Sequence, residues 1–188
     1  GTLVWLNAGS RITYSQGFGV GNRKIELIGE GYFEVKRNEE VPFLVKTNSL
    51  LVKVLGTKFN FRDYPDDAEA IVSLSEGKVA LNNLLKKEKE AFLLPNERVV
   101  LNKKNGRMHV EYSTVSNALQ WTNGYLFFDE ELLPDVVKEL ERSYNVKIQI
   151  ASDTLNTFRF YGNFVHREQN IQEVLEALSA TRKIHYII

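Results

Sequence analysis

The sequence predicts a mainly β protein with a smaller α+β part. We expect an N-terminal antiparallel β-sandwich or β-roll over residues 1–113, followed by a small βαββαβ domain over residues 114–188. Two observations lead to this prediction. Through the first half, apolar and polar residues alternate in short runs that end at glycine, proline or polar pairs, which is typical of half-buried antiparallel strands. Beyond residue 113, helical and strand periods follow one another instead.

The first half predicts short strands joined by turns. Asn105-Gly106 favours a tight hairpin turn, because both positions tolerate positive φ. Gly29-Glu30-Gly31 also predicts a turn between strands, since it lacks the helix and the lysine that a phosphate-binding loop needs. The alternation does not distinguish a closed barrel from an open roll. The expected strands are Leu3–Asn7, Arg11–Ser15, Arg23–Gly29, Gly31–Arg37, Pro42–Thr47, Leu50–Leu55, Thr57–Tyr64, Glu69–Glu76, Gly77–Asn82, Lys89–Leu94, Glu97–Asn102 and Arg107–Tyr112.

The second half predicts two amphipathic helices packed on a small sheet. Apolar residues recur at helical spacing over Leu133–Tyr144 and again over residues 171–178. Pro134 suits the first turn of the former helix, and Asn170 with Glu173 predicts a capping box for the latter. The expected strands are Tyr125–Phe128, Val146–Ala151, Phe158–Phe164 and Lys183–Ile188. The expected core of this half is Leu126, Phe128, Val137, Leu140, Ile148, Ile150, Phe160, Val174, Leu178 and Ile184.

Composition narrows the possible functions. The 188 residues carry 24 basic and 24 acidic side chains, so no net charge favours nucleic acid or an anionic membrane as partner. The chain has no cysteine, which leaves it without a disulfide framework or a thiol nucleophile. No apolar run is long enough to span a membrane.

Residues with catalytic chemistry do not form a convincing group. The three histidines have no second ligand at metal-binding spacing, and the aspartates around Pro65 suit a solvated turn. Glu30 and Glu34 share a strand face at a spacing that suits the two carboxylates of a glycosidase, but strand alternation produces many such pairs. We therefore predict a binding or regulatory module without enzymatic activity, metal or cofactor.

An aromatic segment in the second half is the candidate binding surface. Phe158-Arg159-Phe160-Tyr161-Gly162 either packs on its own helices or presents a face to a partner, and an exposed sheet edge would accept a partner strand. The candidate partner-binding residues are Tyr125, Phe127, Phe158, Phe160, Tyr161 and Phe164. A charged residue at Phe160 or Tyr161 is expected to abolish binding and to leave the fold intact.

Several motifs, in order, resemble those of FecR-type anti-sigma regulators. In the first half they are Leu6-Asn7-Ala8-Gly9-Ser10, the run from Leu27 to Val35, Pro42–Thr47, Val54–Asn60 and Glu76-Gly77-Lys78-Val79. In the second half, Trp121–Phe128 and Leu140–Tyr144 resemble the C-terminal domain of these proteins, which is similar to the secretin and TonB short N-terminal domain.

The resemblance implies a periplasmic domain of a single-pass inner-membrane protein. It implies that the N-terminal signalling domain of a TonB-dependent receptor binds this region, and that site proteases then release an extracytoplasmic-function (ECF) sigma factor. The sigma-binding cytoplasmic segment and the membrane helix are expected upstream of Gly1. Neither a cofactor nor nucleic acid is implied. The alternative of a different class is a carbohydrate-binding module with an accessory α/β domain.

Overall fold

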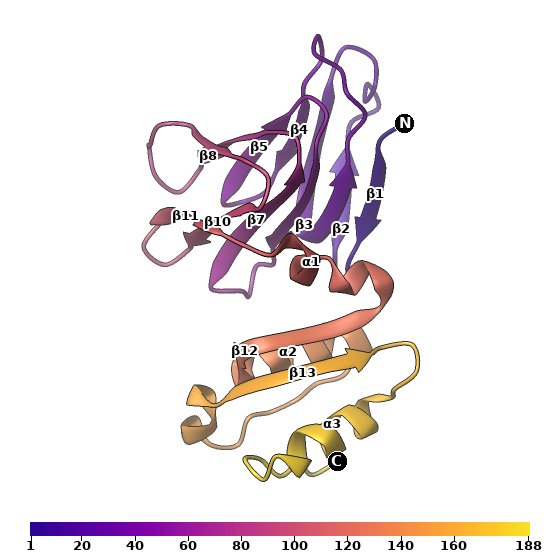
Figure 1. Ribbon diagram of the computed structural model, residues 1–188, viewed down its shortest axis with the longest axis vertical. Helices are drawn as coiled ribbons and strands as arrows, with labels where there is room; N and C mark the ends of the chain where they lie inside the picture. The colour runs from indigo at the N-terminus through magenta and orange to yellow at the C-terminus, as the bar shows by residue number, and fades with distance from the viewer. The chain divides into compact units, whose positions relative to one another are not determined.

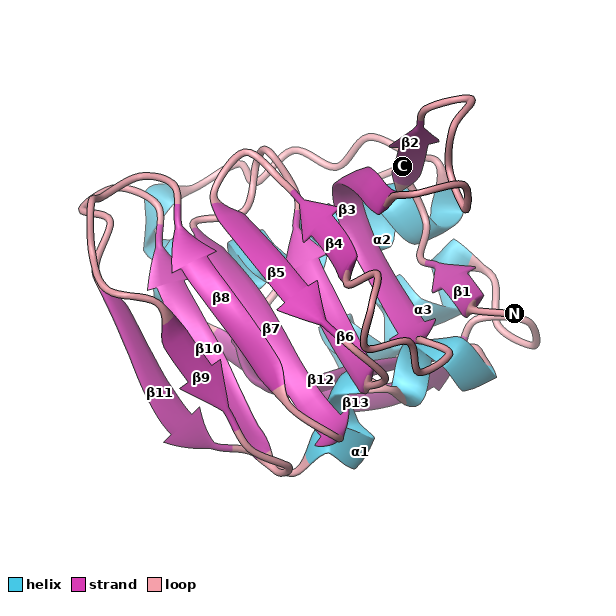
Figure 2. Cartoon of the chain, turned by 90° about the horizontal axis from the view of Figure 1, so that it is seen from above, coloured by secondary structure: helices cyan, strands magenta, loops and turns pink.

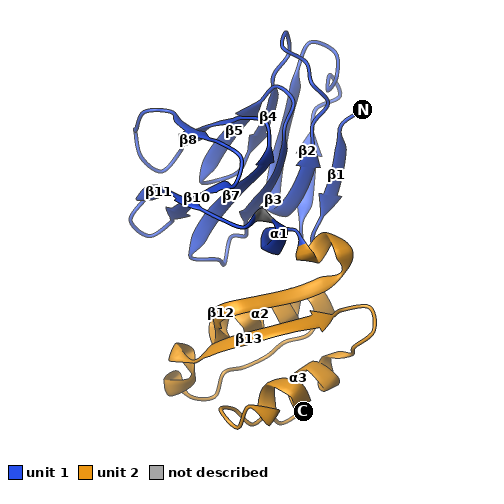
Figure 3. Ribbon diagram, in the orientation of Figure 1, with its two compact units in different colours: residues 1–119 blue, residues 120–188 orange. Residues whose placement is uncertain are grey.

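The computed structural model describes residues 1–188 except Val115. The chain forms two compact units, Gly1–Leu119 (unit 1) and Gln120–Ile188 (unit 2), which Figure 3 distinguishes by colour. The short helix α1 (Val115–Ala118) belongs to unit 1, so the division falls slightly later than the predicted boundary at residue 113. None of the described helices is both long and apolar enough to cross a membrane.

Unit 1 is built from strands, as its alternating sequence predicts. The strands are β1 (Leu3–Leu6), β2 (Arg11–Tyr14), β3 (Arg23–Glu34), β4 (Phe43–Lys46), β5 (Leu50–Val54), β6 (Lys58–Asp63), β7 (Glu69–Glu76), β8 (Val79–Asn83), β9 (Ala91–Leu93), β10 (Glu97–Asn102) and β11 (Met108–Tyr112). They pair in the order β11-β10-β7-β6-β3-β4-β5-β8-β9, and β1 and β2 also pair with β3 (Figures 1 and 2). Strands β3 and β4 are parallel, and the remaining described pairs are antiparallel.

Strand β3 connects the two halves of this sheet, and here the sequence prediction is wrong. Residues 23–29 and 31–37 were expected as two strands with a turn at Gly29, whereas Arg23–Glu34 is one strand. Its first half pairs with β2 and β4, and its second half pairs with β1 and β6. Gly29 has φ +99°. A glycine that interrupts alternation can redirect a strand as well as end it, because it adopts positive φ without steric cost.

The two halves of the sheet enclose one hydrophobic core. Phe33 of β3 is fully buried; its ring stacks on Phe59 of β6 with centroids 5.0 Å apart and lies 6.2 Å from Phe43 of β4. Side chains of the β4, β5, β8 and β9 half thus meet side chains of the β6, β7 and β10 half. The sheet is therefore folded over its own apolar face, as in a sandwich.

Unit 2 combines two helices with two strands. Its elements are the 3-10 helix η1 (Gln120–Asn123), β12 (Tyr125–Leu132), α2 (Leu133–Tyr144), the 3-10 helix η2 (Asp153–Thr157), β13 (Arg159–Val165) and α3 (Ile171–Ala180). Helix α2 ends at the left-handed Asn145. The capping box of α3 is confirmed: the Glu173 N–H donates to Asn170 Oδ1 at 3.1 Å, and the Asn170 N–H donates to Glu173 Oε2 at 2.8 Å. The ten predicted core residues all belong to the unit's core or pack against it.

The complete βαββαβ pattern is not found. Residues 146–151 and 183–188 were expected as strands, but within the described chain only β12 and β13 form a ladder in unit 2. Their polar groups bond locally instead: the Ile148 N–H donates to Glu141 Oε1 at 2.8 Å, and the Ile184 carbonyl accepts from Ser179 Oγ at 3.1 Å. The alternation of apolar and polar residues predicted which side chains of these segments face the core. It could not predict whether a neighbouring strand is available to pair with them.

Tyr144 at the end of α2 leads to a pH prediction. Burial, followed by the charge of Glu173, raises the pKa of Tyr144 above its ordinary value of 10.0, and its hydroxyl donates to the Gln169 carbonyl at 3.1 Å. Because the unfolded chain loses the Tyr144 proton at a lower pH than the folded chain, the stabilisation is complete below pH 10 and is lost as pH rises through the raised pKa.

We expect the free energy of unfolding to fall less between pH 8 and 11 in Tyr144→Phe than in wild type. Urea titrations at both pH values measure this. An unchanged pH dependence in Tyr144→Phe would contradict the assignment.

Candidate functional site

Three of the sequence motifs meet at the buried carboxylate of Glu30. The Asn7 amide donates to Glu30 Oε2 at 2.8 Å, and the Asn60 amide donates to Oε1 at 2.7 Å. Arg62 Nη1 lies 3.4 Å from Oε2, and its Nε donates to Asp67 at 2.8 Å. Glu30 is 4% exposed, so these donors replace the water that a carboxylate would otherwise require.

Further polar contacts join the same network to the chain around it. The Tyr64 hydroxyl donates to the Ala8 carbonyl at 2.7 Å and lies 3.2 Å from Ser10 Oγ, which in turn accepts from the Glu30 N–H. Lys103 Nζ lies 2.6 Å from Asp63 Oδ1 and also contacts the Tyr64 carbonyl. These groups connect β3, β6 and the turn after β1. Asp63 Oδ2 is buried without a hydrogen-bond partner. We interpret the network as structural, because the Glu30 carboxylate at its centre is engaged by donors of the same unit.

Sequence reasoning did not identify this network. It treated Glu30 as one carboxylate on a strand face and did not connect it with Asn7 or Asn60. One signal was available for Asn60, which lies between Phe59 and Phe61 in β6, because a polar group among buried apolar side chains is normally hydrogen-bonded. Among the described residues, no group of three or more histidine, aspartate or glutamate side chains is arranged to hold a metal ion.

The six predicted partner-binding residues separate into two sets in unit 2. Phe160 and Phe164 are 2% and 7% exposed and belong to its core, where Phe164 lies 6.1 Å from Phe128. Phe158 is partly buried and packs against the same core. A charge at Phe160 would have to be buried among apolar side chains, so we now expect it to unfold the unit rather than to remove a contact selectively.

The other three predicted residues lie on the opposite face of the β12–β13 ladder. Phe127 pairs with Asn163, and Tyr161, two residues earlier on β13, shares their side of the sheet, as does Tyr125. We call Tyr125, Phe127, Tyr161 and Asn163 the outer face. Tyr161 is 64% exposed.

Acidic groups border the outer face. Between Phe128 and Glu131 the ladder register shifts, and Glu130 in this irregularity has φ +57°. A hydrogen bond with Glu130, then desolvation, raises the pKa of Tyr161. The Glu130 carbonyl also accepts from Arg159 at 2.6 Å. The irregularity thus places a carboxylate beside an exposed aromatic ring, a combination suited to a partner with basic and apolar groups.

The ladder of unit 2 also offers free edges. In the described chain, β12 and β13 pair only with each other, so each has one side without a strand partner. Unpaired strand edges accept an added strand through main-chain hydrogen bonds. An aromatic outer face and open strand edges are features of a protein-binding module.

Both units match models of known protein families. Residues 1–80 match the model of the FecR protein family, and residues 125–188 match the model of the FecR C-terminal region. The chain belongs to the FecR family of anti-sigma factors, which is a regulatory family.

Solved structures agree with this assignment. Two crystal structures of a candidate anti-sigma factor from Parabacteroides distasonis ATCC 8503, at 1.65 and 2.50 Å resolution, superpose with TM-scores of 0.89 and 0.88. In both cases the sequences are 33% identical, and the match covers 100% of this chain and 86% of the solved chain. A comparison with curated proteins found no match.

Proposed function

We propose that this chain is the periplasmic signal-sensing region of an anti-sigma regulator. It relays the state of a TonB-dependent outer-membrane receptor to an ECF sigma factor by protein–protein contact. The observation that carries the proposal is membership of the FecR family, which both units support separately. The carbohydrate-binding alternative receives no support from these comparisons.

In this proposal the partner is the N-terminal signalling domain of the receptor. The sigma-binding segment and the membrane helix would belong to parts of the protein outside this sequence, and site proteases would act after receptor binding. The proposed localisation is the periplasmic side of the inner membrane. The FecR family consists of membrane-anchored sensors with a periplasmic region, which supports this placement.

The outer face is the proposed contact for the receptor domain. Aromatic side chains bury a large apolar area at little cost in conformational entropy and are common among residues that dominate binding energy. Tyr125, Phe127 and Tyr161 supply such side chains, whereas Phe160 and Phe164 support the sheet from its other side. An edge of β12 or β13 would add main-chain hydrogen bonds to the same contact.

Replacing Tyr161 or Phe127 with glutamate should weaken receptor binding. Loss of an aromatic residue at the centre of an interface typically costs about 2 kcal/mol, which corresponds to roughly 30-fold in Kd. Both side chains lie away from the core of unit 2, so the unfolding transition should stay close to that of wild type. Isothermal titration calorimetry with the purified signalling domain of a TonB-dependent receptor from the same organism measures the effect.

The matched control for this experiment changes an exposed tyrosine of unit 1. Tyr112 is 86% exposed on β11 of unit 1, and Tyr112→Glu should bind as wild type does. Unchanged binding by both Tyr161→Glu and Phe127→Glu would remove the outer face from the interface and leave the function intact. Failure of the wild-type chain to bind the signalling domain would overturn the proposed function.

A further inference from the structure

Two neighbouring loops of unit 1 carry most of its unpaired basic side chains close together. One loop, residues 84–90, follows β8, and the other, residues 103–107, connects β10 to β11 (Figure 1). Asn83 joins them, because its Nδ2 donates to the Gly106 carbonyl at 3.0 Å. The Lys86 side chain also lies against Gly106, where an added Cβ would meet Lys86 Cγ at 3.1 Å. We call these two loops the loop pair.

The first of these loops has a defined shape that keeps two leucines at the surface. Asn83 Oδ1 accepts from the Leu85 N–H at 2.9 Å and from the Lys86 N–H at 3.1 Å, as in an Asx turn. The Leu84 N–H donates to the Ser49 carbonyl at 2.9 Å. Leu84 and Leu85 are each 43% exposed. Main-chain hydrogen bonds, rather than burial of the leucines, thus determine the course of this loop.

Positive charge predominates in the loop pair. Lys103 is paired with Asp63 at 2.6 Å and is left out of this comparison. The other basic residues are exposed, and none of them has an ion pair within the described part of the chain: Lys86, Lys87, Lys89, Lys104 and Arg107. The acidic residues are Glu88 and Glu90, and Glu88 accepts from the Asn83 amide at 3.1 Å. The whole chain is neutral, so this positive field is local.

Acidic residues of the neighbouring β6–β7 turn do not cancel this field. The Lys103 N–H donates to the Ala68 carbonyl, so this turn borders the second loop. Asp63 is already paired with Lys103, and Asp67 accepts from Arg62 Nε at 2.8 Å. These carboxylates are therefore neutralised within unit 1, and the cations beside the leucines keep their charge.

The order of residues in the first loop suits the surface of a lipid bilayer. Leu84 and Leu85 are followed directly by Lys86 and Lys87. Leucines can enter the boundary between headgroups and acyl chains, while lysine side chains extend so that their ammonium groups reach the lipid phosphates. A bilayer with anionic lipids attracts such lysines by about fivefold in affinity for each residue near the surface. Apolar and basic groups are thus both accounted for by one occupant.

Other occupants account for only part of this composition. Protein interfaces are enriched in aromatic residues and arginine and depleted in lysine. Neither loop contains an aromatic residue, and four of the five unpaired cations are lysines. Nucleic acid would engage the cations through its phosphates but would leave the two exposed leucines without a role. A second copy of the chain would bring the same positive charge to the contact.

We propose that the loop pair docks on the surface of a bilayer that contains anionic phospholipids. Leu84 and Leu85 enter the headgroup region, and the lysine ammonium groups contact lipid phosphates. All of these residues belong to unit 1, so the docking requires neither the outer face of unit 2 nor the receptor as partner. It adds a lipid contact to the protein contact proposed above.

Sedimentation of the whole chain with large unilamellar vesicles tests this proposal. We expect binding to phosphatidylcholine vesicles that contain one third phosphatidylglycerol, none to pure phosphatidylcholine, and weaker binding as salt is raised. The double variant Lys86→Glu with Lys87→Glu should lower the partition coefficient by about tenfold or more. Leu84→Ser with Leu85→Ser should lower it by about fivefold or more. All four positions are exposed, so the unfolding midpoints should stay close to that of wild type.

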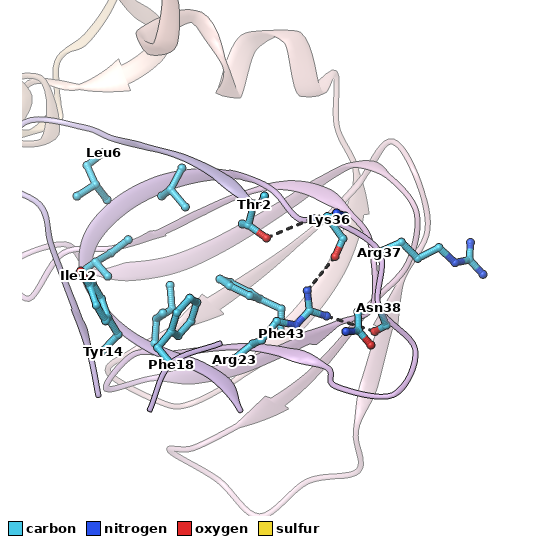
Figure 4. Close-up of a pocket in the computed structure, with 13 residues that line it drawn as sticks. Thr2, Leu6, Ile12, Tyr14, Phe18, Arg23, Lys36, Arg37, Asn38 and Phe43 are labelled. Carbon is cyan, nitrogen blue, oxygen red and sulfur yellow. Dashed lines mark hydrogen bonds between the residues drawn. The ribbon is translucent and has the colours of Figure 1, made fainter. Parts of the chain in front are cut away.

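A matched control uses another place where basic and apolar side chains gather. A groove of about 720 Å³ in unit 1 is lined by Ile12 and Phe18 and by the exposed Lys36 and Arg37 (Figure 4). It shares no residue with the loop pair. The double charge reversal Lys36→Glu with Arg37→Glu should leave the partition coefficient unchanged. An equal loss in this control would show general attraction of cations to the vesicle and would contradict the proposal.

A fluorescent label tests whether the leucines enter the bilayer. The chain has no cysteine, so Leu85→Cys supplies a single thiol for an environment-sensitive nitrobenzoxadiazole label. Its emission should rise and shift to shorter wavelength on addition of the anionic vesicles, whereas the same label at Lys53→Cys, an exposed position of β5, should not respond.

Four outcomes would overturn the proposal. The first two are failure of the wild-type chain to bind anionic vesicles and full binding by the double leucine variant. The third is an unchanged emission of the label at residue 85. The fourth is equally tight binding of a DNA oligonucleotide, because it would identify any polyanion, rather than a bilayer, as the occupant.

Discussion

Replacing Gly29 with alanine is expected to destabilise unit 1 by about 3 kcal/mol or more. Gly29 has φ +99°, a conformation that a residue with a Cβ rarely adopts. The added Cβ would also lie 2.9 Å from Ser10 Cα and 2.8 Å from Ser10 Cβ, and the backbone contact cannot be relieved by turning a side chain. The strand crosses between the two halves of the sheet at this point, so strain here affects the pairing of both. Urea unfolding monitored by circular dichroism measures the loss.

Gly19→Ala separates backbone strain from steric conflict. Gly19 also has positive φ, +87°, but a Cβ there would meet nothing within 4 Å. We expect this variant to lose only about 1 kcal/mol. Equal losses in the two alanine variants would show that close packing against Ser10 contributes nothing, and would contradict the role assigned to Gly29.

Replacing Glu30 with alanine should have an effect of similar size. The substitution removes the acceptor that Glu30 provides to the buried Asn60 amide and to the partly buried Asn7 amide, and it removes one partner of Arg62. Removing one member of a buried charged network typically costs about 3–5 kcal/mol, because the remaining groups have lost their water without compensation. The free energy of unfolding from denaturant titration is again the measurement. Glu30→Gln, which keeps one acceptor oxygen, should lose less than Glu30→Ala.

An exposed glutamate on the same strand serves as the control. Glu26 precedes the crossing point, and its carboxylate lies 4.0 Å from Lys46 at the surface. Such exposed pairs contribute little, so Glu26→Ala should lose no more than about 0.5 kcal/mol. If Glu30→Ala were as mild as Glu26→Ala, the network would not be a source of stability, and the coincidence of the three motifs at Glu30 would need another explanation.

The candidate sites were predictable to different degrees. The aromatic residues of unit 2 were found from sequence, since an aromatic strand is visible as a pattern. Their division into core and outer face needed the tertiary structure, because alternation along a strand does not specify which of its two faces packs on the helices.

The sequence by itself determined most strands of unit 1, the two longer helices of unit 2, the core residues of unit 2 and the family. Period-two alternation defined the strands of unit 1, helical spacing with Pro134 and the Asn170 cap defined α2 and α3, and the ordered motifs led to the FecR family. These are properties of residues near each other in the chain, where steric preference and burial act over a few positions. Only the tertiary structure decided that Gly29 redirects a strand and that side chains of three motifs meet at Glu30. Each of these depends on contacts between segments far apart in sequence, and the chain alone does not specify which distant segments meet.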